Sequence, residues 1–119
     1  MANKYRGEID AELNGLPFRL CLTLGALAEL ESAFGDSDML GLAERFEKGR
    51  LSAKDAIRII GAGLRGAGHD VGDDAVAKMK TLNGATDFVD IVARLLGATF
   101  GSGGSAREKE TDPRPLAKT

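Results

Sequence analysis

The feature that most constrains the fold is a turn between two alternating segments near the N-terminus. Before the turn, Ile9, Ala11 and Leu13 alternate with charged residues, and this period of two is typical of a half-buried β-strand. Asn14-Gly15 suits a two-residue type I′ turn, because both central residues of that turn need positive φ. Large apolar residues alternate again after the turn, at Phe18, Leu20, Leu22 and Leu24. The sequence therefore predicts an antiparallel β-hairpin.

After the hairpin, the spacing of apolar residues changes to that of helices. Thr23 is the expected N-cap of a first helix, and Gly35 is its expected stop. A second short helix is expected to begin at a cap formed by Asp36 or Ser37 and to end at Gly49. The chain thus changes from strands to helices within its first third.

Three further helices are expected in the second half of the chain. Ser52 and Asp55 have the spacing of a capping box, which predicts the start of the third helix. Asp73 is expected to cap a fourth helix that stops at Asn83-Gly84 and carries Val76, Met79 and Leu82. Thr86 is expected to cap a fifth helix, whose apolar residues cover about half of the helical wheel and predict the central helix of the core.

These elements predict one α+β domain over residues 1–100. In it, an N-terminal antiparallel β-hairpin packs on a bundle of about five short helices. Residues 101–119 are small, charged and proline-containing, and Leu116 is their only large apolar residue after Gly101. Such a segment cannot offset its ordering entropy by burial, so we expect a disordered C-terminal tail.

The charge and composition argue against several classes of partner. The 16 Lys and Arg residues are mixed with 18 Asp and Glu residues, so there is no basic stripe for direct binding of nucleic acid. One Tyr and no Trp offer little surface for stacking bases. The sequence lacks a signal-peptide pattern and an apolar run of membrane-spanning length. We therefore expect a cytoplasmic protein that binds no membrane, and its single cysteine fits a reducing compartment.

The stretch from Gly61 to Gly66 matches the G-x-G-x-x-G pattern of dinucleotide-binding loops. In a binding loop the first glycine follows a strand and the last opens a helix, but here the glycines lie at the end of a helical pattern. The C-terminal end of a helix repels phosphate. We therefore interpret Gly61 and Gly63 as sites of close helix packing, and Gly66 and Gly68 as the end of the helix and its turn.

The remaining candidates for chemistry are isolated. His69 lies beside Asp70, Asp73 and Asp74, but this segment lacks the register of a calcium loop and is better explained as a solvated, helix-capping turn. A nucleophilic pair of Cys21 with His69 is an alternative that packing of the cysteine explains more simply. We therefore expect no catalytic residues, no cofactor, no metal site and no enzyme activity.

Two apolar residues lie off the main stripes of their helices. Leu40 in the second helix and Ile59 in the third are our candidates for a partner-binding surface. The alternative is that the packing of five helices uses both side chains.

The order of elements, with LTLGALAELESAFG after the hairpin and GAGLRGAGHDV after the second helix, resembles a known family. It is similar to the small tail protein of gene transfer agents, the phage-derived particles of alphaproteobacteria. The resemblance covers about residues 3 to 100, and its most specific parts are Leu22–Glu31 and Gly63–Gly68. That family is described both as a tail tube protein and as a tail assembly chaperone.

The resemblance implies a non-enzymatic role in building a phage-like tail, with the tape-measure protein or other tail subunits as partners. A chaperone that shields the helical tape-measure protein fits one hairpin and five helices best. The first alternative is a structural tube or virion component that self-associates into rings within phage-like particles and needs a strand-rich domain. A nucleotide-binding protein or enzyme is the distant alternative.

Overall fold

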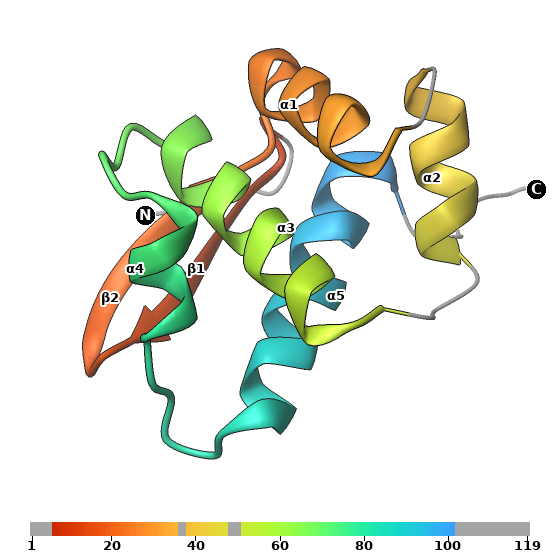
Figure 1. Cartoon of the computed structure of the whole chain (residues 1–119). Helices are drawn as coiled ribbons and strands as arrows, with labels where there is room; N and C mark the ends of the chain where they lie inside the picture. The colour runs from red at the N-terminus through yellow and green to blue at the C-terminus, as the bar shows by residue number, and fades with distance from the viewer. Residues whose placement is uncertain (1–5, 36–37, 48–50, 102–119) are drawn as a thin grey trace, which may run out of the picture.

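The structure is a computed structural model that describes residues 6–35, 38–47 and 51–101. The described residues form an antiparallel pair of strands followed by five helices, which is the predicted α+β fold (Figure 1). The elements in chain order are β1 (Glu8–Leu13), β2 (Leu16–Cys21), α1 (Leu24–Phe34), α2 (Met39–Glu47), α3 (Ala53–Gly66), α4 (Asp73–Ala77) and α5 (Ala85–Phe100). Apart from Gly101, the expected tail lies outside the described residues.

The hairpin has the predicted turn and register. Asn14 and Gly15 have φ values of 55° and 75°, as a type I′ turn requires. Leu13 pairs with Leu16, and Ile9 pairs with Leu20 farther along the ladder. The buried side chains of the two strands lie on one face, at Ile9, Ala11, Leu13 and Leu20.

The central helix of the fold is α3. It contacts β2, α1, α4 and α5, and Figure 1 shows it crossing the middle of the molecule. All six residues from Ile59 to Leu64 are buried, whereas α5 keeps Val89 exposed. The prediction that the last helix is central is therefore wrong. The apolar pattern of α3 is interrupted by glycines, which add no apolar side chain but let neighbouring elements approach from several sides.

Local capping signals place the starts of two helices. The side chain of Thr23 accepts a hydrogen bond from the Ala26 amide at 3.2 Å, and Gly35 ends α1 with a φ of 74°. Ser52 and Asp55 form the predicted capping box, with both hydrogen bonds at 3.1 Å. These predictions are confirmed because each depends on residues a few positions apart.

The start of α2 is capped by a residue that the sequence analysis did not single out. The Asp38 carboxylate accepts a hydrogen bond from the Gly41 amide at 2.8 Å, and α2 begins at Met39. The expected caps Asp36 and Ser37 and the expected stop Gly49 lie outside the described residues.

The fourth helix is shorter than predicted. It ends at Ala77, so Leu82 lies outside it and is exposed. The segment after α4 instead contacts the hairpin turn, where the Asn14 amide donates to the Lys80 carbonyl at 2.8 Å and the Lys80 amide donates to Asn14 Oδ1 at 2.9 Å. These two hydrogen bonds pair both backbone polar groups of Lys80, its C=O and its N–H, although the residue lies outside a helix. Asp73 is also not the N-cap, which is Gly72.

The N-cap of α5 is Gly84 rather than Thr86, which lies within the first turn. The Asp87 carboxylate accepts hydrogen bonds from the Asn83 amide at 2.9 Å and from the Asn83 side chain at 3.2 Å. Asp90 and Arg94, one turn apart in α5, form an ion pair at 2.9 Å. Among the described residues, no helix has the length and apolarity needed to cross a membrane.

Candidate interaction surfaces

The glycine-rich end of α3 is a packing surface. A Cβ at Gly63 would lie 2.7 Å from Leu95 Cδ2 and 3.3 Å from the Leu20 side chain. A Cβ at Gly66 would overlap the carbonyl oxygen of Cys21 in β2, and one at Gly61 would overlap the Asp73 carboxylate. The absent side chains therefore allow α3 to approach β2, α4 and α5 closely.

The three glycines of the G-x-G-x-x-G match, Gly61, Gly63 and Gly66, lie inside α3, in its C-terminal half. A phosphate site would need these backbone N–H groups at a helix N-terminus. Instead, the Ala67 amide donates to the Gly63 carbonyl at 3.1 Å, and the His69 amide donates to the Leu64 carbonyl at 2.9 Å. The interpretation of these glycines as packing and turn residues is confirmed, with one addition. Gly66 also makes a close contact with β2.

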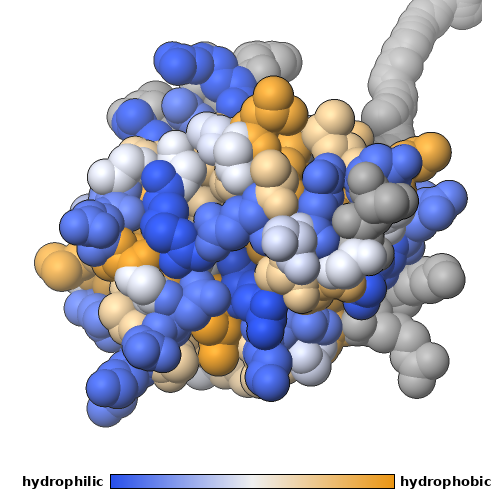
Figure 2. Space-filling model, turned by 45° about the horizontal axis from the view of Figure 1, so that its top comes forward, coloured by the Kyte–Doolittle hydropathy of each residue, from blue (hydrophilic) through white to orange (hydrophobic). Residues whose placement is uncertain are grey.

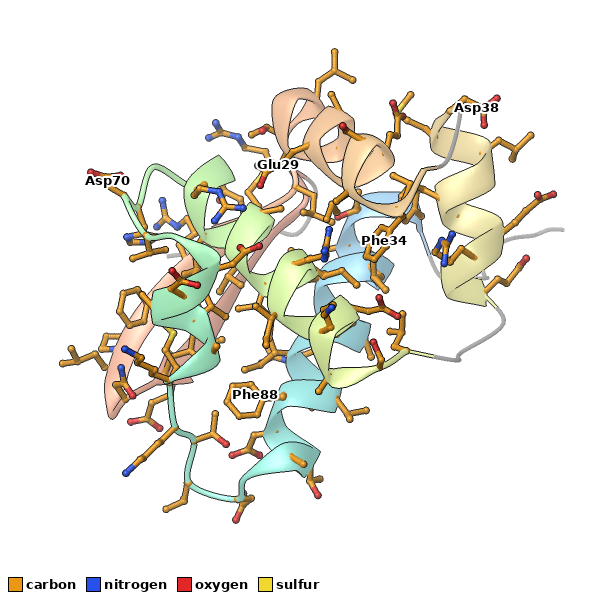
Figure 3. All side chains as sticks on the ribbon, in the orientation of Figure 1. Glu29, Phe34, Asp38, Asp70 and Phe88 are labelled. Atoms are coloured by element: carbon orange, nitrogen blue, oxygen red, sulfur yellow. The ribbon has the colours of Figure 1, made fainter. Side chains whose placement is uncertain are left out.

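Arg65 joins the end of α3 to two other helices. Its guanidinium forms ion pairs with Glu29 of α1 and with Asp73 of α4, the latter at 3.1 Å, and donates to the Val71 carbonyl at 2.9 Å. Figure 3 labels Glu29 on the side of α1 that faces α3. The hydrogen bond to Glu29 is the main reason that the pKa of Arg65 is raised. The guanidinium therefore links α1, α3 and α4 and offsets part of the negative charge of the two carboxylates.

The acidic turn after α3 does not assemble a metal site. No group of three or more His, Cys, Asp or Glu side chains suited to a metal ion occurs in the part of the chain that the structure describes. Asp73 is bound by Arg65, and Asp70 is exposed at the edge of the molecule in Figure 3. The ring of His69 packs edge-on against Phe18, with centroids 5.2 Å apart.

Cys21 and His69 have different surroundings. Cys21 Sγ donates to the Arg6 carbonyl at 3.7 Å, whereas His69 Nε2 is buried and has no hydrogen-bond partner among the described residues. Burial, and then the charge of Glu8, raise the pKa of the Cys21 thiol against the opposing effect of Arg6. An activated nucleophile needs a lowered thiol pKa, so this environment favours an unreactive cysteine.

The two candidates for partner binding lie in different environments. Leu40 is 69% exposed at the start of α2, whereas Ile59 is 0% exposed inside α3. Their positions off the main helical stripes did not distinguish them, because the sequence does not show which side of a helix its neighbours leave open. Among the residues that the structure describes, the other exposed large apolar ones are Leu16, Leu24, Met39, Leu82 and Val89. In the view of Figure 2, apolar residues form small groups among hydrophilic ones rather than one broad patch.

Nothing in the sequence marks most of these apolar residues as exposed. Leu24 continues the alternation of β2, and Leu82 has the spacing of a fourth helix, so both fit patterns of buried residues. Both are exposed because β2 ends at Cys21 and α4 ends at Ala77, before the apolar spacing of each segment ends. Only the bounds of the elements in the folded chain reveal this.

Comparison with known proteins assigns the chain to a family. A family model described as "Phage tail tube protein, GTA-gp10" matches residues 6–102. No curated protein and no solved structure matches the chain. The match spans every described helix and strand, and it confirms the resemblance to tail proteins of gene transfer agents. The chain therefore belongs to the GTA-gp10 family of phage tail tube proteins.

Proposed function

We propose that this tail protein acts during assembly of a phage-like tail, as a chaperone that holds the tape-measure protein before the tube forms. The observation that carries the proposal is the size of the sheet, since the described residues contain two strands against five helices. A ring of tube subunits needs sheets that continue from one subunit to the next. A small, helix-rich domain is better suited to binding a helical partner than to forming that wall.

We place the binding surface at the start of α2. Leu42 is fully buried and anchors this helix, while its neighbours Met39 and Leu40 remain 45% and 69% exposed. The Arg45 guanidinium donates to the Phe34 carbonyl of α1 at 3.1 Å and holds the next turn. Figure 1 shows α2 at one side of the molecule, beside α1. Apolar side chains on an anchored helix suit the apolar stripe of an amphipathic tape-measure helix.

Ile59 is not included in this surface. It is fully buried between the elements that surround α3, and a partner could reach it only after α3 had separated from its neighbours. Leu40 alone of the two candidates is accessible in the folded domain.

Binding of tape-measure peptides to surface variants tests this assignment. Peptides that together cover the tape-measure protein are titrated against the full chain, and we expect Leu40→Glu to weaken binding at least about tenfold, or about 1.4 kcal/mol. Leu82→Glu is the matched control, because Leu82 is also exposed but lies between α4 and α5. Equal affinities for wild type and Leu40→Glu would reject the surface, and absence of binding by the wild type would reject the chaperone role.

The second candidate function is that of a structural subunit of the tail. The family description, which names a tail tube protein, favours this role. Quantitative mass spectrometry of purified particles distinguishes the two functions by counting this chain against the major tail subunits. A chaperone is abundant in the cytoplasm of producing cells and absent from particles, whereas many copies in each particle would establish the structural role. The family is not an enzyme class, so neither candidate includes catalysis.

A further inference from the structure

The tripeptide Leu-Asn-Gly occurs twice in the chain, as Leu13–Gly15 and as Leu82–Gly84. Asparagine followed by glycine is prone to deamidation, because glycine has no side chain to hinder attack by its backbone nitrogen on the asparagine amide. Both asparagines are exposed, so access to water does not distinguish them. Since their direct neighbours are identical, a difference in reactivity between the two sites in the folded protein must come from the structure.

At the hairpin, the tripeptide is held from two sides. Leu13 is fully buried. The Asn14 amide donates to the Lys80 carbonyl at 2.8 Å, and the Lys80 amide donates to Asn14 Oδ1 at 2.9 Å. Asn14 has a φ of 55°, in the left-handed region that the turn requires. In that conformation the Gly15 nitrogen and the Asn14 side chain lie on opposite sides of the Cα–C bond, so attack requires the hairpin turn to open.

Before α5, the same tripeptide has local contacts. Leu82 is 90% exposed and does not anchor the segment, which runs as a loop from α4 to α5 in Figure 1. The Asn83 amide and side chain both donate to the Asp87 carboxylate, at 2.9 and 3.2 Å. Gly84 has a φ of 69° and a ψ of −135°, which favours glycine at this position. A local opening of the loop frees Asn83, and such an opening costs less than opening a packed hairpin.

We propose that Asn83 is a site of spontaneous deamidation in the folded protein, and that the hairpin protects Asn14 from the same reaction. The backbone nitrogen of Gly84 loses its proton to solvent and attacks Cγ of Asn83. The bond from Cγ to the side-chain nitrogen breaks, and this nitrogen takes a proton from solvent and leaves as ammonia. The succinimide ring that remains adds a water molecule and opens to aspartate or to isoaspartate.

The reaction changes the start of α5. Either product replaces the donating side-chain nitrogen of Asn83 with a carboxylate, so the hydrogen bond to Asp87 is lost and two negative charges repel each other. Isoaspartate also adds a carbon to the backbone before Gly84, the N-cap of α5. The first turn of α5 is therefore weakened beside the exposed Leu82. The inference goes beyond the proposed function and holds for a chaperone or a tail subunit, because it depends on the fold alone.

Peptide mass spectrometry of the full chain tests the proposal. The wild type is incubated in mildly alkaline buffer, folded and in denaturing urea, and trypsin then places the two asparagines in different peptides. We expect similar rates in urea, whereas in the folded protein Asn83 should deamidate at least about tenfold faster than Asn14. Equal rates in the folded protein, a faster reaction at Asn14, or a folded Asn83 that stays intact while the unfolded chain reacts would overturn the proposal.

Two variants check the assignment of the sites. In Asn83→Gln the product in that peptide should disappear while the rate at Asn14 stays unchanged, because the longer glutamine side chain closes a larger ring and reacts far more slowly. Lys80→Pro removes the N–H group that donates to Asn14 Oδ1 and should speed deamidation of Asn14 toward its rate in urea. An unchanged rate at Asn14 in a folded Lys80→Pro variant would contradict the protection by the hairpin, and the wild-type comparison does not depend on this variant.

Discussion

Helices α3 and α2 are held in the fold in opposite ways. α3 contacts four other elements and buries six consecutive residues, three of which are too small to fill space themselves. α2 packs against α1, with Leu42 as its fully buried large side chain and with two exposed apolar residues at its start. The difference shows that, among the described helices, a glycine-rich one is held by the most neighbours, while the more apolar start of α2 is exposed.

The largest effect should come from adding one carbon at the tight end of α3. We expect Gly66→Ala to lower the free energy of unfolding by about 3 kcal/mol, because its Cβ would overlap the backbone carbonyl of Cys21, which cannot rotate away. Chemical denaturation monitored by circular dichroism measures the change.

Gly97→Ala in α5 is the control for that substitution. No atom of the described residues outside its own helix lies within 4 Å of the added Cβ, so the better helix propensity of alanine should stabilise the protein by about 0.5–1 kcal/mol. A Gly66→Ala variant as stable as Gly97→Ala would show that α3 is not tightly packed at this end, and the comparison with α2 would fail.

A smaller effect is expected at the polar attachment of α3. Arg65→Met should cost about 1–2 kcal/mol, because it removes hydrogen bonds to α1, to α4 and to the turn between α3 and α4. The cost is limited because Glu29 and Asp73 are partly exposed and water can solvate them. Thermal and denaturant unfolding measure this loss of stability. If the loss disappears at high salt, Arg65 contributes only a surface ion pair that salt screens.

How much of this fold the sequence predicts depends on the distance between the residues that decide each feature. The Asn14-Gly15 turn, the Thr23 cap and the Ser52–Asp55 capping box involve neighbours and were predicted correctly. The early end of α4 depends on Lys80 bonding to Asn14, 66 residues away, and no local pattern shows that pairing.

The candidate surface was predictable in part for a related reason. Leu40 and Ile59 have the same appearance in the sequence, as apolar residues off a stripe, but one is exposed and the other is surrounded. Ile59 is buried because α3 lies at the centre of the fold. That central position depends on the glycines of α3, which let neighbouring elements pack closely against it. The spacing of apolar side chains in the sequence leaves glycines out, so it does not reveal this close packing.

The same change at the attachment of α2 sharpens the comparison. Arg45→Met should cost less than about 1 kcal/mol, because the contacts that it removes near solvent include a hydrogen bond to the Phe34 carbonyl and a cation–π contact with the Phe34 ring at 5.1 Å, and such exposed contacts contribute little. Hydrogen exchange should show faster opening of α2 with little change in α3. A loss equal to that of Arg65→Met would mean that the two helices are attached equally firmly.

The smallest effect should be a pH dependence at Cys21, where β2 meets the end of α3. Because burial raises the pKa of this thiol in the folded state, its contribution to stability is fully present below the unfolded pKa and is lost as pH rises through the folded value. The unfolding free energy of the wild type should therefore fall slightly more between about pH 8 and about pH 10.5 than that of Cys21→Ser, which has no thiol to ionise. The difference between the two curves cancels the titration of lysines common to both proteins. If the unfolding free energy falls more steeply with pH in Cys21→Ser than in the wild type, the folded protein favours the thiolate. The contact between β2 and α3 would then be more polar than the packing at Gly66 implies.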